Sequence, residues 1–63
     1  MENSSSLNNI GFLYDNGIGV REDKKIAFEY YKKSAELGNV IAIYNIGICY
    51  EEGLGVAKNE KKI

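Results

Sequence analysis

The sequence contains no histidine, no proline and no tryptophan, and its 63 residues include a single cysteine, Cys49. Without histidine, the commonest general base and the commonest metal ligand are both missing. A lone cysteine forms neither an intramolecular disulfide nor a multi-cysteine zinc site. Because proline is absent, no residue forces a break in a helix. We therefore expect a chain with no catalytic residues, no metal ligands and no cofactor.

The sequence also has no large excess of positive or negative charge and no long apolar run. Eight Lys and Arg residues against nine Asp and Glu residues give a net charge of −1, so no basic excess is available to neutralise nucleic-acid phosphates. No apolar run approaches the ~20 residues that span a bilayer, and no basic-then-apolar leader opens the chain. We expect no nucleic-acid binding, no membrane insertion and, by default, a cytoplasmic location. A chain this short holds at most one small domain.

The sequence repeats with a period of 36 residues. The segment NIGFLYDNGIGV at 9–20 aligns with NIGICYEEGLGV at 45–56, and nine of the 27 positions in 1–27 are identical to their counterparts in 37–63. The identical positions include glycines and tyrosines that stay in phase, which indicates a structural repeat. We divide the single domain 1–63 into one repeat at about 3–38 and a partial repeat at about 39–63.

Each repeat begins with a segment that has helical periodicity. Residues 7–16 place their apolar side chains on one arc of a helix, and the second copy does the same. These arcs consist of Leu7, Ile10, Gly11 and Tyr14, and of Ile43, Ile46, Gly47 and Tyr50. A second helix, at roughly 24–37, is apolar over more than half of its circumference, so it must be covered on two sides.

Turn and capping residues mark the ends of these helices. Asn3, Asn39 and Asp23 precede helical segments, where their side chains can accept hydrogen bonds from free backbone N–H groups. Gly17 and Gly53 are expected to end the first helix of each repeat in a left-handed conformation. The sequence therefore predicts an all-α chain of helices joined by tight turns.

A glycine lies in the middle of each apolar arc, where it lowers helix propensity by about 1 kcal/mol. We expect Gly11 and Gly47 to mark places where two helix backbones approach closely. Gly47→Val should then destabilise the protein more than Ala42→Val. Tyr14 and Tyr50, one turn further on, are expected to fill the adjacent grooves with their rings.

These residues resemble those of a known family. The pattern N-I-G-x-[LC]-Y-x-x-G-x-G-V, followed in the first copy by Asp23, Ala27, Tyr30, Tyr31, Lys33, Ala35 and Gly38, is similar to the Sel-one-like repeat, a relative of the tetratricopeptide repeat. The resemblance implies αα-hairpins stacked as a short right-handed solenoid, with scaffold or adaptor function. The structural motif residues would be Gly11, Tyr14, Gly17, Gly19, Gly47, Tyr50, Gly53 and Gly55. Ser34 departs from the family's alanine, and Ser4–Ser6 indicate a polar edge.

Three features allow chemical alternatives that we consider weaker. The Gly-x-Gly turns could suggest a phosphate loop, but the third glycine of the dinucleotide motif and the Gly-Lys-Ser/Thr sequence are both missing. Asp15, Glu51 and Glu52 could act as acids or bases, but we expect them to face solvent. Cys49 could be a nucleophile, but it replaces Leu13 of the first copy, so we expect a half-buried packing residue.

Outside the core arcs, the first helix of each repeat carries one surface of mixed polar and apolar residues. It would lie on the concave face of a solenoid and bind a peptide or a partner domain, with Phe12 and Ile48 as its apolar members. The proposed binding residues are Asn9, Phe12, Leu13, Asn16, Asn45, Ile48 and Glu52. Alternatively, they contact neighbouring helices, Asn9 and Asn45 tie helix to helix, and the chain is a purely structural segment. We also expect self-association through an uncovered C-terminal flank at Ile43, Ile46 and Tyr50.

Overall fold

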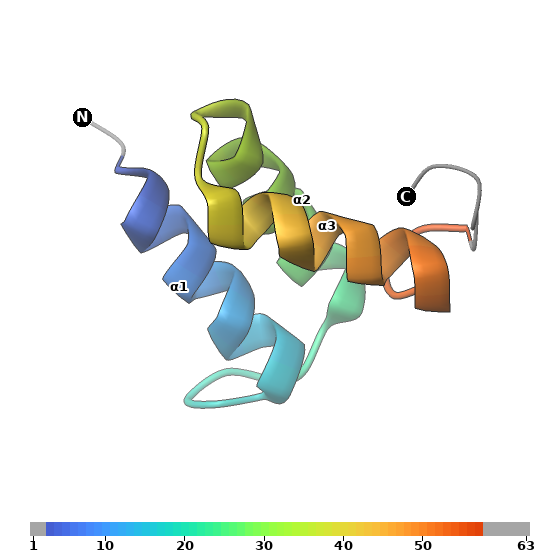
Figure 1. Cartoon of the computed structure of the whole chain (residues 1–63). Helices are drawn as coiled ribbons and strands as arrows, with labels where there is room; N and C mark the ends of the chain where they lie inside the picture. Colours follow the sequence, from blue (N-terminus) through green and yellow to red (C-terminus); the bar gives the residue numbers. More distant parts are fainter. Residues whose placement is uncertain (1–2, 58–63) are drawn as a thin grey trace.

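The structure, a computed structural model, describes residues 3–57 and contains three helices within that range. Helix α1 spans Ser4–Asn16, α2 spans Lys24–Glu36 and α3 spans Val40–Glu52. Figure 1 shows α2 behind α1 and α3, and α2 packs against both of them. No strand occurs between residues 3 and 57, so the all-α fold built from αα-hairpins is confirmed.

The predicted capping residues occupy the helix ends. Asn3, Asp23 and Asn39 each use a side-chain oxygen to accept a backbone N–H two or three residues later, at 2.7, 3.1 and 2.9 Å. Gly17 and Gly53 have φ angles of 64° and 70°, which is the left-handed conformation expected of them. These local signals therefore set both boundaries of α1 and α3.

The start of α1 follows its predicted cap, and the end of α2 differs by one residue from the sequence-based prediction. Helix α1 begins three residues earlier than the apolar arc, because Asn3 caps it and Ser4–Ser6 form its first turn. Helix α2 ends at Glu36 instead of Leu37, and Gly38, with φ of 88°, then reverses the chain. Both boundaries lie where a capping group or a glycine satisfies the backbone.

The close approach expected at Gly11 is present in the α1–α2 interface. A Cβ atom added to Gly11 would lie 2.8 and 2.9 Å from the Cδ1 and Cε1 atoms of Tyr31, and 3.1 Å from the carbonyl oxygen of Ala27. The Tyr31 ring therefore occupies the space that a side chain at position 11 would fill. Tyr14 extends the contact, because its ring stacks on that of Tyr30 with centroids 6.0 Å apart.

The α2–α3 interface completes the core. Cys49 is buried against Ala27 and Tyr31, so it lies deeper than the half-buried position expected from sequence. The turn after α3 also packs on the start of α2, since a Cβ atom at Gly55 would overlap the carbonyl oxygen of Lys24. Helix α2 is thus covered on two sides, as its broad apolar surface predicted.

The close approach expected at Gly47 is not found among residues 3–57, and that prediction is wrong for this part of the chain. Apart from the neighbouring backbone of α3 itself, no described atom lies within 4 Å of a Cβ atom added to Gly47. Ile43 is 52% exposed, whereas its counterpart Leu7 is 6% exposed. The counterparts of Ala27 and Tyr31 would be positions 63 and 67. The first lies outside the described residues and the second lies beyond the sequence.

The expected order of the two valine substitutions is therefore reversed. Ala42 is fully buried, whereas Gly47 is half-buried and no other described element lies within 4 Å of a Cβ atom added to it. A larger side chain at position 42 would overpack the α2–α3 contact. We now expect Ala42→Val to be the more destabilising change.

Polar side chains join the beginnings of α1 and α3 to the end of α2. The Ser34 hydroxyl, which is fully buried, donates to the carbonyl oxygen of Ser4 at 2.6 Å. The Asn39 amide donates to the Ser4 hydroxyl at 3.4 Å. Ser34 thus supplies a hydrogen bond between helices that an alanine at this position would lack.

Candidate functional site

Helices α1 and α3 lie side by side where they begin and then diverge (Figure 1). The Asn45 side-chain amide donates to the Asn8 side-chain oxygen at 3.1 Å and joins the two helices. Phe12 follows Asn8 by one helical turn, and Ile48 follows Asn45 by one turn, so each continues the helix face that carries the amide pair. We refer to Asn9, Phe12, Asn16, Asn45, Ile48 and Glu52 as the α1–α3 face.

Most of the α1–α3 face is accessible. Phe12 is 49% exposed and Ile48 is half-buried. The exposed polar members are Asn9, Asn16 and Glu52. The Asn16 amide donates to the Phe12 carbonyl oxygen at 3.0 Å, which holds that side chain over the last turn of α1. The accessible part of the α1–α3 face thus combines an exposed aromatic ring with uncharged amides and one carboxylate.

One of the expected binding residues, Asn45, has a structural role that competes with binding. Asn45 bonds to Asn8, as in the alternative that this amide ties helix to helix. Leu13 is 37% exposed, but its counterpart in the second repeat, Cys49, packs on α2. Leu13 itself is exposed beside the α1–α3 face, and its part in binding stays a prediction.

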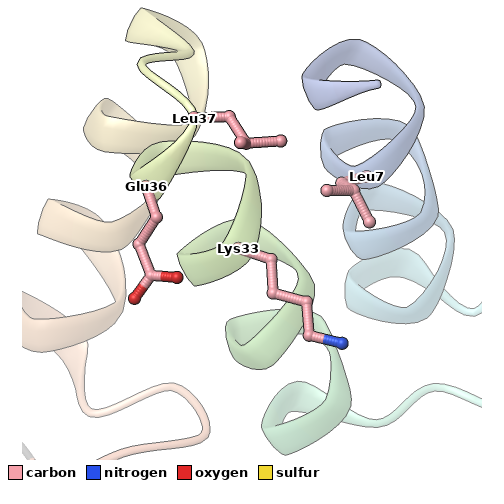
Figure 2. A pocket seen from close by; sticks show the side chains of 4 residues that line it. All are labelled: Leu7, Lys33, Glu36 and Leu37. Atoms are coloured by element: carbon pink, nitrogen blue, oxygen red, sulfur yellow. The ribbon is translucent and has the colours of Figure 1, made fainter. Parts of the chain in front are cut away.

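A groove that the sequence did not indicate lies between the start of α1 and the end of α2. It has a volume of about 450 Å³ and is lined by Leu7, Lys33, Glu36 and Leu37. Figure 2 shows the two leucine side chains facing each other across it, with the Lys33 and Glu36 side chains extending from α2. The groove is open to solvent, and its lining could hold one apolar side chain beside a charged group.

A polar cluster connects the end of α1 to α2, and the expectation that Asp15 faces solvent is wrong. The Lys24 ammonium donates to one Asp15 carboxylate oxygen at 2.8 Å and to the Asp15 carbonyl oxygen at 2.6 Å. The Tyr31 hydroxyl donates to the other carboxylate oxygen at 3.2 Å. Because the Asp15 carbonyl is in the last turn of α1, Lys24 also satisfies a free helix-end acceptor.

These contacts change the acidity of the groups involved in a way that suits a structural role. The hydrogen bond from Lys24 to Asp15 raises the pKa of the Lys24 ammonium above its ordinary value. Burial, with a further contribution from the Asp15 charge, raises the pKa of the Tyr31 hydroxyl. Both groups therefore keep their protons at neutral pH, and neither is prepared to accept one from a substrate.

Cys49 has the properties of a packing residue. Burial raises the pKa of its thiol to about 11, so the nucleophilic thiolate is scarce at neutral pH. Between residues 3 and 57 no three His, Cys, Asp or Glu side chains come together as a metal site would require. None of the helices in this range has the length and apolar content needed to cross a bilayer.

Comparison with known proteins agrees with the helical repeat. The family model described as Sel1 repeat matches residues 4–39 and 40–62. A solved structure, described as a Sel1 repeat protein from Oxalobacter formigenes, superposes with a TM-score of 0.93 at 42% sequence identity over 95% of this chain. This chain spans 24% of the length of that protein. No curated protein sequence matches the chain. On the family match and the superposed helices together, this chain belongs to the Sel1 repeat family.

Proposed function

We propose that this chain is a protein-interaction module that binds a peptide or a partner domain on the α1–α3 face. Sel1 repeats form non-catalytic helical scaffolds that generally mediate contacts between proteins. The observation that carries the assignment to this face is Phe12, a large aromatic side chain left 49% exposed one turn after the Asn8–Asn45 pair. Aromatic side chains contribute much of the binding energy of protein interfaces, because they bury a large area with little loss of conformational freedom.

The rest of the α1–α3 face suits an extended or helical peptide. Its amides, at Asn9 and Asn16, can donate to and accept from peptide groups, and Ile48 offers an apolar contact on the opposite helix. The only carboxylate on the face is Glu52, so we expect binding to depend weakly on salt. The chain acts in this proposal without a cofactor, a metal ion or a nucleic acid.

A purely structural role is the second candidate, and one observation favours it. The Asn45 amide is already bonded to Asn8, so this member of the face is used within the protein. In that case the chain would position other parts of a larger protein, and the exposed Phe12 would have no partner of its own.

Paired alanine variants distinguish the two candidates. Phe12→Ala with Ile48→Ala removes the apolar part of the α1–α3 face, whereas Glu29→Ala with Lys32→Ala removes two exposed side chains from the outer face of α2. Both double variants should retain the far-UV circular dichroism of the parent, because neither pair belongs to the fully buried core. Partners captured by the parent and by the α2 variant should be lost from the Phe12/Ile48 variant. Equal capture by all three proteins would remove the basis for this assignment.

A further inference from the structure

One asparagine of the chain directly precedes a glycine. Asn16 is the last residue of α1 and Gly17 follows it, whereas the other asparagines precede serine, asparagine, isoleucine, valine or glutamate. The side-chain amide of an asparagine can react with the backbone nitrogen of the next residue. Glycine hinders this approach least, because it has no Cβ atom, whereas a side chain branched at Cβ, such as Ile46 after Asn45, obstructs it.

The Asn16–Gly17 bond lies in an accessible turn. Residues 16–22 are all exposed, and the turn projects away from the three helices (Figure 1). A hydrogen bond from the Asp23 N–H to the Tyr14 carbonyl oxygen, at 2.9 Å, closes the base of the turn. The turn can therefore open while α1 and α2 remain packed against each other.

Two hydrogen bonds oppose the reaction while the turn is closed. The Asn16 side-chain amide donates to the Phe12 carbonyl oxygen at 3.0 Å, and the Gly17 N–H donates to the Leu13 carbonyl oxygen. Both bonds must be released before the Gly17 nitrogen reaches the Asn16 side-chain carbon. Helix ends open more readily than helix centres, so the last turn of α1 controls access to the reaction.

We propose that Asn16 is a site of spontaneous deamidation, reached when the last turn of α1 opens. Hydroxide takes the proton of the Gly17 amide, and the nitrogen forms a bond to the Asn16 Cγ atom. The bond from Cγ to the side-chain nitrogen breaks, and the nitrogen leaves as ammonia after taking a proton from water. Water then opens the cyclic imide at either of its two carbonyl groups, which gives aspartate or isoaspartate at position 16.

The second repeat shows that a carboxylate is compatible with this position. The counterpart of Asn16 is Glu52, which is exposed at the end of α3, and the next residue, Gly53, has a φ angle of 70° against 64° for Gly17. The aspartate product therefore suits the fold. Isoaspartate adds a methylene group to the main chain directly before Gly17, so it displaces the N–H that caps α1.

Both products change the α1–α3 face. Each adds a negative charge beside Phe12 and removes the amide that donates to the Phe12 carbonyl oxygen. The face then carries a carboxylate on both helices, at position 16 and at Glu52. The reaction itself needs no partner, so this proposal and the proposed function can fail independently.

The first test follows the full 63-residue chain during incubation at neutral and at alkaline pH. Peptide mapping by mass spectrometry should show conversion at Asn16 at least tenfold faster than at Asn39 and Asn45, which precede valine and isoleucine. The rate should rise with hydroxide concentration. Both aspartate and isoaspartate should appear, because direct hydrolysis of the side chain gives aspartate alone.

A synthetic peptide of residues 9–23 measures the reaction without the fold. The chain should react severalfold more slowly than the peptide, because the cap is closed most of the time, and low urea should change the rate in the chain only slightly. Gly17→Ala should slow the reaction of the peptide at least tenfold. This variant is tested in the peptide because a φ angle of 64° would strain an alanine in the chain.

The separated products test the effect on the fold. The aspartate form and the Asn16→Asp variant should melt close to the parent, whereas the isoaspartate form should melt at a lower temperature. Equal conversion at Asn16, Asn39 and Asn45, or aspartate without isoaspartate, would overturn the site. Equal rates in chain and peptide, or a rate that rises steeply with the first additions of urea, would overturn control by the last turn of α1.

Discussion

Adding one methyl group at equivalent positions of the two repeats should change stability in opposite directions. Gly11→Ala places a Cβ atom 2.8 and 2.9 Å from two ring carbons of Tyr31, well inside the ~3.5–4.0 Å of a favourable carbon–carbon contact. The ring cannot easily move aside, because Tyr31 is 2% exposed and its hydroxyl is bonded to Asp15. Overpacking of a rigid site costs about 2–3 kcal/mol, at the upper end of the usual range.

Helix propensity offsets part of that cost, because alanine is favoured over glycine by about 1 kcal/mol. Gly11→Ala should therefore lower the free energy of unfolding by about 1–2 kcal/mol. Gly47→Ala gains the same propensity and meets no described atom, so it should raise the free energy of unfolding by up to about 1 kcal/mol.

Thermal and urea melts of the parent and of both variants, followed by circular dichroism at low protein concentration, measure this difference. In a domain of this size about 1 kcal/mol corresponds to about 4–8 °C, so the two melting temperatures should differ by roughly 10–20 °C. Shifts in the same direction would show that the space over Gly47 is closed in solution, or that the Tyr31 ring does not hold the space over Gly11.

Further outcomes follow from the buried polar groups. Ser34→Ala should lower the free energy of unfolding by about 1 kcal/mol in urea melts, through loss of its hydrogen bond to Ser4, and unchanged stability would contradict that role. A double-mutant cycle of Asp15→Asn and Lys24→Met should give a coupling of about 0.5–1 kcal/mol that decreases with salt, because the ammonium is partly solvated. The free energy of unfolding should fall as the pH rises from about 9 to about 11, because burial raises the pKa of the Cys49 thiol to about 11 and the thiol therefore ionises first in the unfolded chain. Thermal melts at several pH values should show a smaller fall for Cys49→Val.

The features that could be predicted from sequence depend on short stretches of chain. Asn3, Asp23 and Asn39 cap helices whichever partner the helix later meets, because the hydrogen bond closes within three residues. The left-handed turns at Gly17 and Gly53 are equally local. These residues set the helix boundaries, and the 36-residue period supplies the order in which the helices pack.

The features that the sequence did not reveal depend on which residues of another helix pack against a given position. Gly11 and Gly47 share the context Asn-Ile-Gly, yet Tyr31 covers the first and no described residue covers the second. The bond between Asp15 and Tyr31 joins residues 16 positions apart, and no local pattern indicates which carboxylate will turn inward. Position 13 and its counterpart differ in the same way, since Leu13 is exposed whereas Cys49 is a core residue.

The central claim is that partners bind on the α1–α3 face. Photo-cross-linking tests it most directly, with benzoylphenylalanine placed at position 12 on that face or at position 29 on the outer face of α2. Both positions are exposed and helical, so both reagents report on what lies within a few ångströms in the bound state. We expect a specific cross-link to the partner from position 12 and none from position 29. A cross-link from position 29 alone, with the partner still bound, would contradict it.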